Sequence, residues 1–586
     1  GGGPLREGGC WADMPGGFAE EFVQCRELSP EITIFWKVLG NELLLGLNAL
    51  APTQAFESAS PYVGIGFTEA GGMKGGDLLV VGYVESLSKS LPDGTATIAT
   101  QTIGDFMVLD TFTKEFAAPL ADEQQDATLL GVDVSSLKGR WLVALRRPLQ
   151  TCDPDDLAVD PRLPTPVSWS VGVWPFGHGR NRGVSHVCFG CTLDAGPIAL
   201  CGAAAADADV GADAEVLVLT LAMPNVTLSE AETDFQCVPM RVADGSRRHI
   251  IAFEGFNEAS VPGMLHHMVV YHCSSPPDWL LASGDGGFEP FECWSMPPGC
   301  DSLEYAWAPG VQKWELPGDV GVVLQPGGVY VMQMHYTNRD GVAGATDSSG
   351  VRLTTTKQLR ARDAWMLMLG SRALWLPPRE GVLNASPAAC SSKCTGRLPA
   401  PLRVLTTALH MHEIGKSMTL RHFRNGTELS PLGVRSAYDY NFQAFGMNPP
   451  EAVVMPGDTL VTSCSYDTTT REQVTTYGDR TQDEMCFAFV MVHEITAQEA
   501  AALGVPPPPD GAPWAPSITG HEQFGRTPAT RFKLCTSMWV PQSLWLTAKL
   551  LGIVTEESPT ADICVNLNDA TQAFRPNSAS AAVALM

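Results

Sequence analysis

Two runs near the start of the chain, Tyr62-Val63-Gly64-Ile65-Gly66-Phe67 and Leu78-Leu79-Val80-Val81-Gly82-Tyr83-Val84, set the expectation for the fold. Each run is short and rich in aliphatic, β-branched and aromatic residues, and a glycine-rich segment separates them, as is typical of neighbouring β-strands. Similar runs recur at 32–38, 141–145 and 167–171. Many short strands with dense turns predict an all-β chain made of sandwiches, and 497–503 is one short helical candidate.

The composition limits the classes of protein that the chain can belong to. With 38 Lys and Arg against 64 Asp and Glu, the formal net charge is −26, which argues against binding to nucleic acid or to anionic lipid. No apolar run reaches about 18 residues, so we expect no membrane span in this chain. The start, Gly1-Gly2-Gly3-Pro4, has no signal-peptide pattern, so we expect that a leader was removed or that the sequence is a fragment.

The length of 586 residues suggests about three to five domains. The strand pattern pauses in the Gly/Ala/Cys-rich segment 175–213 and resumes near 215. We expect an irregular lead-in at 1–29, a β-sandwich at 30–175, a linker at 176–214, further β domains at 215–360 and 361–545, and a tail at 546–586.

Sixteen cysteines and three N-glycosylation sequons indicate an oxidising compartment. The sequons begin at Asn225, Asn384 and Asn425, and predict a glycoprotein of the secretory-pathway lumen or the extracellular space. One alternative is that the cysteines are reduced and buried as small apolar side chains. The other is a metal–thiolate cluster, for which Cys188 and Cys191 are the nearest candidates but lack a second pair at finger-like spacing.

Five of the 12 histidines fall into three clusters within or beside β-type runs: His266 with His267, His335 alone, and His410 with His412. Residues i and i+2 of a strand project from the same face, so His410 and His412 can converge on one metal ion. His266 and His267 would point to opposite faces of a regular strand, so their joint ligation requires a kink.

The types of the clustered side chains narrow the choice of metal. Imidazoles without a carboxylate cluster argue against calcium and magnesium and suit zinc, copper, iron or nickel. A thioether ligand would favour copper because soft sulfur stabilises Cu(I). Met485, in the segment Asp483-Glu484-Met485-Cys486, could supply one, although by composition alone it is one of 20 methionines.

The three histidine clusters, their order and the Glu484-Met485-Cys486 segment resemble the copper type II, ascorbate-dependent monooxygenases. The stretches Met223-Pro224-Asn225-Val226 and Tyr438-Asp439-Tyr440-Asn441-Phe442-Gln443 agree with this likeness, which covers about 215–545. The N-terminal sandwich resembles a DOMON domain through the run 62–67, Gly71-Gly72-Met73, Asp77-Leu78 and the run 147–153. One such domain before the catalytic pair is the arrangement of the dopamine β-hydroxylase and monooxygenase-X branch.

The resemblance implies two jelly-roll-like antiparallel β-sandwiches that face each other across a wet cleft and hold one copper ion each. His266, His267 and His335 would bind the electron-transfer copper, and His410, His412 and Met485 the oxygen-binding copper. Two electrons from ascorbate would then support hydroxylation of a C–H bond of a small organic substrate by dioxygen. Neither nucleic acid nor a protein nucleophile is expected to take part, and a homo-oligomer stays open.

The resemblance also implies disulfide bonds. Cys464 would pair with Cys486 beside the methionine ligand. The pairs of the first copper domain would be Cys237–Cys293 and Cys273–Cys300. Cys390 and Cys394 would reach toward Cys535 and Cys564. The sequence leaves open the pairing of six cysteines: Cys10, Cys25, Cys152, Cys188, Cys191 and Cys201.

Several positions depart from the peptide-amidating members of the family. Ala408 stands where they carry an arginine, and Phe487 and Phe489 replace an asparagine and a tyrosine, so the groups that hold a peptide carboxylate are missing. We therefore expect a more apolar pocket for an aromatic or aliphatic small molecule, with aromatic amines among the candidates; alternatively, both phenylalanines are core residues. His410-Met411-His412-Glu413 also replaces the family's usual HTHL.

A second hypothesis is a non-catalytic redox or ligand-binding protein that acts through the N-terminal sandwich. Some DOMON-type domains bind haem b through a methionine and a histidine, and Met73 with His178 or His186 could do so here. A third, a sugar-binding or adhesion module, has only the sandwich fold behind it. A haem absorption band would favour the second hypothesis over the copper enzyme.

Overall fold

The computed structural model describes most of the chain in ordered segments. These are residues 10, 14–15, 18, 20–50, 60–82, 102–107, 120–121, 125–133, 139–151, 153, 156–174, 181–190, 216–242, 245–281, 289–300, 302–309, 311, 313–372, 374–385, 387–396, 398, 400–504, 534–539 and 560–565. Their regular structure is almost entirely β-strand, which confirms the predicted all-β class. The chain divides into two compact units, Gly1–Gly202 and Ala203–Met586.

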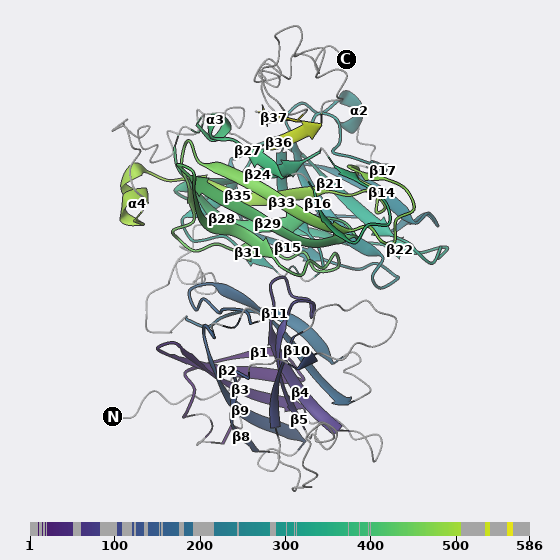
Figure 1. Ribbon diagram of the computed structural model, residues 1–586. Helices are drawn as coiled ribbons and strands as arrows, with labels where there is room; N and C mark the ends of the chain where they lie inside the picture. The colour runs from purple at the N-terminus through teal and green to yellow at the C-terminus, as the bar shows by residue number, and fades with distance from the viewer. Residues whose placement is uncertain are drawn as a thin grey trace. The chain divides into compact units, whose positions relative to one another are not determined.

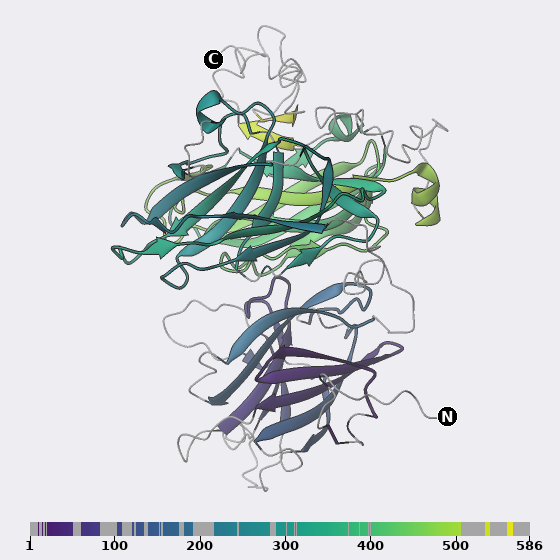
Figure 2. The same ribbon diagram turned by 180° about the vertical axis from the view of Figure 1, so that it is seen from behind.

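The first unit is a sandwich of two antiparallel sheets, which Figures 1 and 2 show from opposite sides. One sheet has the order β1-β2-β3-β9-β8 and the other β11-β10-β4-β5-β6-β7. Side chains such as Leu45 and Val143 from one sheet and Ile65 and Leu79 from the other form one buried apolar cluster. Its strands are β1 (Gln24–Ser29), β2 (Ile32–Leu39), β3 (Glu42–Leu50), β4 (Ser60–Phe67), β5 (Asp77–Gly82), β6 (Thr102–Met107), β7 (Leu120–Ala121), β8 (Thr128–Asp133), β9 (Arg140–Pro148), β10 (Pro164–Trp174) and β11 (Arg182–Cys188).

Two stretches that carry the DOMON resemblance meet inside this unit. Arg147 of β9 is fully buried and forms an ion pair with the buried Asp77 at the start of β5, while its guanidinium lies 4.6 Å from the centre of the Phe67 ring. Arg147 also donates to the carbonyl of Leu157 at 2.9 Å. Because a buried arginine needs partners for its charge, these contacts tie the two sheets together.

The structure corrects three of the expected boundaries. Strand β1 (Gln24–Ser29) lies in the segment expected to be an irregular lead-in, and Cys25 is joined there to Cys10. Strand β11 (Arg182–Cys188) lies in the expected linker, where it pairs with β10 at the edge of the sheet. Strand β37 (Thr560–Val565) lies in the expected tail and pairs with β36. These three strands lie at sheet edges and pair with one neighbour each. Edge strands need fewer apolar residues, so their sequences do not show a clear strand pattern.

The second unit holds the remaining strands in larger sheets (Figure 1). Its first half contains β12 (Val216–Ala222), β13 (Val226–Thr227), β14 (Thr233–Arg241), β15 (Arg248–Phe256), β16 (Leu265–Cys273), β17 (Phe291–Glu292), β18 (Ser302–Trp307), β19 (Trp314–Glu315), β20 (Val320–Leu324), β21 (Val329–Thr337), β22 (Thr346–Asp347) and β23 (Gly350–Thr356). Its second half contains β24 (Arg362–Ser371), β25 (Trp375–Leu376), β26 (Val382–Asn384), β27 (Ala388–Cys390), β28 (Leu402–His410), β29 (Gly415–Arg424), β30 (Thr427–Arg435), β31 (Gly446–Met447), β32 (Val453–Val454), β33 (Thr459–Asp467), β34 (Thr475–Thr476), β35 (Cys486–Glu494), β36 (Leu534–Trp539) and β37.

One sheet runs through both halves of the second unit, in the order β12-β23-β15-β20-β24-β35-β28-β31. Strands β20 and β24 join the halves by parallel pairing, which starts at Val320 opposite Arg362. The apolar core of the first half also takes in Met366 of β24 and Met491 of β35. The two halves therefore share both a sheet and a core.

Helices are short. Within the part of the chain that the structure describes, they include α2 (Asp278–Leu281), α3 (Ser392–Thr395) and α4 (Ala497–Ala502), the last of which confirms the helical candidate. Thr496 and Glu499 form a reciprocal capping box that satisfies the first N–H groups of α4. Among the described residues, no helix has the length and apolarity needed to span a membrane.

Candidate metal centres and the pocket beside them

The first histidine set lies on two paired strands, β16 and β21. His267 of β16 stands directly opposite His335 of β21. The register shifts between Leu265 and His267, so His266 is an extra residue on its strand. This β-bulge supplies the kink that adjacent histidines require, because it turns His266 toward the same side as His267.

The three imidazoles offer nitrogen atoms that all lie within 4.8 Å of one another. The Nδ1 atoms of His266 and His267 are 2.9 Å apart. The Nε2 of His266 lies 3.2 Å from the carbonyl oxygen of Tyr440. Because a carbonyl oxygen can only accept, Nε2 carries the proton and Nδ1 is the unprotonated nitrogen that can bind a metal ion. Nε2 of His335 lies 3.3 Å from the hydroxyl of Thr481, and its buried Nδ1 has no hydrogen-bond partner. A buried nitrogen without a partner in such a cluster fits a metal ligand.

The second set lies at the ends of β28 and β35, which are paired strands. His410 is the last residue of β28 and stands opposite Phe487 of β35. His412 lies two residues beyond the end of β28, and Met485 directly precedes β35; both residues border the same pocket. The centres of the His410 and His412 rings are 5.2 Å apart.

Hydrogen bonds fix which nitrogen each of these rings presents. Nδ1 of His410 donates to the side-chain oxygen of Gln443 at 2.6 Å. Nδ1 of His412 donates to the carbonyl of Asp483 at 2.9 Å. In both rings the proton is therefore on Nδ1, and Nε2 is unprotonated. Such hydrogen bonds are the usual means of fixing the tautomer and orientation of a metal-binding histidine.

A buried carboxylate holds the backbone around this second set. Glu484 is fully buried and accepts hydrogen bonds from the N–H groups of His412 at 2.9 Å, Ile414 at 3.0 Å and Met485 at 3.3 Å. Burial raises the pKa of Glu484 to about 8, while the three N–H donors act in the opposite direction. The hydroxyl of Tyr466 donates to the carbonyl of Met485 at 2.7 Å. Glu484 thus holds the segment after β28 against the segment before β35 through these hydrogen bonds.

The pKa values of the clustered histidines are lowered, with burial as the largest cause. Burial, aided by the neighbouring His410, lowers the pKa of His266 from 6.5 to about 3, and the pKa of His412 falls to about 3 in the same way. The pKa values of His267, His335 and His410 are lowered as well. All five rings are therefore neutral near pH 7, which is the form that binds a metal ion.

The two sets lie close together. The ring centres of His267 and His410 are 5.8 Å apart, and the Tyr440 ring stacks on His266 with a centre-to-centre distance of 3.8 Å. We expected the sets to face each other across a wet cleft. A pocket borders both sets, but the rings of His267 and His410 approach each other directly. The Tyr440 ring lies against His266 of the first set and against His412 of the second.

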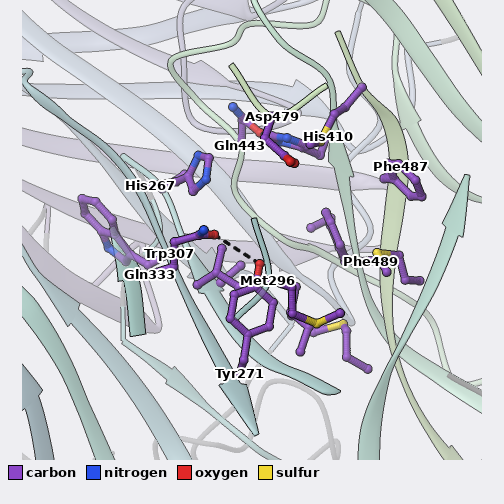
Figure 3. A pocket seen from close by; sticks show the side chains of 18 of the residues that line it. His267, Tyr271, Met296, Trp307, Gln333, His410, Gln443, Asp479, Phe487 and Phe489 are labelled. Atoms are coloured by element: carbon purple, nitrogen blue, oxygen red, sulfur yellow. Dashed lines mark hydrogen bonds between the residues drawn. The ribbon is translucent and has the colours of Figure 1, made fainter. Parts of the chain in front are cut away.

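The pocket beside the two sets has a volume of about 470 Å³ and is bordered by His267, His410, His412 and Met485 (Figure 3). Its wall is mostly apolar and comes from both halves of the unit: Val269, Met296, Leu303, Trp307, Met366, Met368, Ala408, Leu409, Phe445, Phe487 and Phe489. The two phenylalanines are thus wall residues, as expected of a more apolar pocket. Polar groups are fewer; Figure 3 shows the Tyr271 hydroxyl donating to Gln333, at 3.3 Å.

Glu413, which departs from the family's usual HTHL, has a partner in the other half of the unit. Its carboxylate pairs with Arg339, which follows β21, and lies 3.8 Å from Arg471. The exposed Arg339 makes this a surface ion pair of small energetic weight. Glu413 therefore does not disturb the neighbouring His412, whose backbone is held by Glu484.

Three of the remaining histidines within the described segments contact acidic side chains or a backbone carbonyl. His249 pairs with Asp363 at 3.1 Å, His422 with Asp458 at 2.6 Å, and His493 contacts the carbonyl of Glu494. His178, one haem candidate, lies outside the described residues. Met73 lies in a turn of the first unit and His186 on β11, and their role in haem binding stays a prediction.

The structure has the disulfide pairs Cys237–Cys293, Cys273–Cys300 and Cys464–Cys486 that the resemblance implied, and adds Cys10–Cys25. Cys188, Cys390 and Cys394 are also disulfide-bonded, and β27, which carries Cys390, lies beside β36 and β37. The links to Cys535 and Cys564 stay a prediction, and Cys152, Cys191 and Cys201 lie outside the described residues. The sequon residues Asn225, Asn384 and Asn425 are exposed, as glycosylation requires.

Sequence reasoning did not single out Glu484, Gln443, Tyr440 or Thr481 as site residues. All four are buried, and each contacts a clustered histidine or the backbone beside it. The position of Glu484 directly before Met485 could have indicated its role, since an acidic side chain next to a buried strand needs hydrogen-bond donors around it. Gln443 is 33 residues from His410, and nothing local links them.

Comparisons with known proteins agree with this geometry. Residues 219–343 match the model of the copper type II ascorbate-dependent monooxygenase N-terminal domain, and residues 362–507 match that of the C-terminal domain. These two segments contain all six clustered residues, His266, His267, His335, His410, His412 and Met485. Over residues 219–343 and 362–507, the chain is thus similar to the copper type II ascorbate-dependent monooxygenases.

Named relatives cover more of the chain. DBH-like monooxygenase protein 1 of Gallus gallus is 27% identical over 509 residues, which are 84% of this chain and 76% of that protein. Dopamine beta-hydroxylase of Homo sapiens is 28% identical over 409 residues, which are 66% of this chain and 62% of that protein. Among solved structures, the major capsid protein P2 from Bacteriophage PM2 covers 48% of this chain and 99% of its own at 12% identity, but its TM-score of 0.23 carries no argument.

Proposed function

We propose that the protein is a monooxygenase that uses two copper ions, ascorbate and dioxygen to hydroxylate a C–H bond of a small organic substrate. One copper ion would be held by His266, His267 and His335, and the other by His410, His412 and Met485. The observation that carries the proposal is the set of ring tautomers: hydrogen bonds place the proton of His266 on Nε2 and those of His410 and His412 on Nδ1, so the other nitrogen of each ring is unprotonated and can bind a metal ion.

The donor types fit copper. Five neutral imidazoles suit several metals, and one thioether favours copper because soft sulfur stabilises Cu(I). When bound, copper supplies the one-electron chemistry that links ascorbate to dioxygen. The chain's own residues orient the ligands, keep the imidazoles neutral by burial, and shape the pocket in which the substrate is held.

The pocket supports a small and largely apolar substrate. Its volume of about 470 Å³ lies in the usual range for small-molecule sites. Ala408, Phe487 and Phe489 border it, so at these positions it lacks polar groups that could hold a peptide carboxylate. We propose an aromatic or aliphatic substrate, with aromatic amines among the candidates.

Replacement of Met485 tests the assignment of the second metal site. Met485→Ala should abolish ascorbate-driven hydroxylation and lower the copper content from about two ions per chain toward one, because Met485 is not among the ligands proposed for the first site. Met447→Ala, which removes a thioether from the short strand β31, is the matched control and should keep both ions. Normal turnover in Met485→Ala would refute the assignment.

We propose that the protein works in the secretory-pathway lumen or outside the cell. At least eleven of the 16 cysteines are disulfide-bonded, and such bonds persist in oxidising compartments. Titration of free thiols in the native protein should therefore find only a minority of the cysteines reduced. A majority of reduced cysteines would contradict this placement.

We propose further that the first unit is a DOMON-type domain, on the strength of its two-sheet fold and the buried Arg147–Asp77 pair. Whether it binds haem is a separate question. A haem absorption band that is lost in Met73→Ala or His186→Ala would support that role, and its absence would count against it.

A further inference from the structure

The loop after β30 lies between the two metal-binding sets and contacts both. Its residues Tyr440 and Gln443 are almost fully buried. Tyr440 stacks its ring on His266 of the first set, and Gln443 contacts His410 of the second. No other residue of this loop contacts a clustered histidine through a described hydrogen bond.

The hydrogen bonds of this loop form a continuous chain. Nδ1–H of His410 donates to Oε1 of Gln443 at 2.6 Å, and Nε2–H of Gln443 donates to the carbonyl oxygen of Tyr440 at 2.8 Å. The same carbonyl oxygen accepts Nε2–H of His266 at 3.2 Å. A carbonyl oxygen has two lone pairs, so it can accept both bonds.

The proton positions along this series of hydrogen bonds follow from which groups can donate and which can only accept. The carbonyl of Tyr440 can only accept, so the amide group of Gln443 must present its nitrogen there and its oxygen to His410. His410 must then carry its proton on Nδ1. By the same reasoning His266 must carry its proton on Nε2. One carbonyl oxygen thus selects the metal-binding nitrogen of one ring in each set.

We propose that Gln443 is a positioning residue that couples the ligand geometry of the two metal sites through the carbonyl oxygen of Tyr440. The inference rests on the proposed function only in naming the metal; the hydrogen-bond chain exists without it. Burial makes the coupling strong, because a group that loses its partner here has no water to replace it.

Two substitutions at this position separate the two bonds of Gln443. Gln443→Glu keeps an oxygen acceptor for His410 and, when ionised at alkaline pH, presents a second oxygen to the Tyr440 carbonyl in place of the N–H donor, which repels that carbonyl. Gln443→Leu removes both bonds at similar volume. Gln358→Leu, at an exposed glutamine outside this loop, is the matched control.

The first measurement uses the copper-free protein with 15N-labelled histidine rings, in which NMR reports the tautomer of each ring. In Gln443→Glu we expect His410 to keep its Nδ1 proton and the signals of His266 to change. In Gln443→Leu we expect both rings to change, and in Gln358→Leu neither. If His266 is unchanged in both Gln443 variants, the coupling does not exist.

The second measurement is copper binding, followed by the EPR spectrum of each Cu(II) site. Loss of the partner of a metal-binding histidine typically weakens metal binding about 10- to 100-fold. We expect a loss of this size at both sites in Gln443→Leu, and at the His266 site alone in Gln443→Glu. Failure of the wild type to bind copper would refute the proposed function but leave the NMR test of the coupling intact.

Discussion

At the scale of single residues, the two candidate metal sites depend on buried polar groups that hydrogen-bond the histidines and the backbone beside them. Glu484 shows this most clearly, since one carboxylate binds three backbone N–H groups from the two segments that carry His412 and Met485. A buried group with this many partners is costly to alter, because each lost hydrogen bond leaves a donor without water.

Glu484→Gln should therefore destabilise the protein and weaken the second metal site. The new amide nitrogen would face an N–H group in place of an oxygen, so we expect the free energy of unfolding to fall by about 1–3 kcal/mol. Urea unfolding and copper content measure the two effects. Glu472→Gln, the same change at an exposed side chain, is the control. Equal stability of the Glu484 and Glu472 variants would show that the carboxylate is not a structural tie.

At the scale of elements, paired strands decide which side chains meet. The β-bulge on β16 turns His266 toward His267 and His335, and the pairing of β28 with β35 brings the end of β28, which precedes His412, beside the start of β35, which follows Met485. The Cys464–Cys486 bond links β33 to the start of β35, directly after Met485. It limits how far this end of β35 can move from the imidazoles.

Replacing both cysteines of this bond with serine should lower the free energy of unfolding by about 3 kcal/mol, the value for a loop of this length. It should also lower the copper content of the second site, because Met485 loses its anchor. The Cys273–Cys300 bond closes a loop of similar length in the first half of the unit, with a sequence separation of 27 against 22, so its double serine variant is the control. Similar copper loss in both variants would argue against a specific role for the first bond.

At the scale of the whole molecule, two halves share a sheet and a core, and the clustered histidines lie in the buried region where they meet. The lowered pKa values of His266 and His412 link this burial to the stability of the fold. The folded state keeps both rings neutral down to about pH 3, whereas the unfolded chain protonates them below 6.5. The unfolded state therefore binds more protons between these values.

The copper-free protein should thus lose stability as the pH falls from 6.5 toward 3, by at most about 1.4 kcal/mol per pH unit for each of these two histidines. Above pH 6.5 they contribute no further change. Glu484 acts oppositely, since its raised pKa gives stability at low pH that is lost between 4.5 and about 8. Urea unfolding of wild type and His412→Gln across this range isolates the histidine contribution. A parallel pH dependence in both proteins would contradict the prediction.

The all-β class, the three histidine clusters and the resemblance to a family of copper enzymes could be predicted from the sequence alone. This was possible because strand periodicity, turn composition and the spacing of rare side chains are local properties. The sequence also indicated that adjacent His266 and His267 need a kink. It placed the boundaries of the lead-in, linker and tail wrongly, because strands β1, β11 and β37 have weak local patterns.

The groups around the candidate metal-binding nitrogens follow from the folded structure alone. Gln443 reaches His410 across 33 residues, and Thr481 reaches His335 across 146. The ring tautomers, the neutral state of the buried imidazoles and the 5.8 Å approach of His267 to His410 all depend on such long-range contacts. Strand register and burial create these contacts, and neither is a property of any short stretch of sequence.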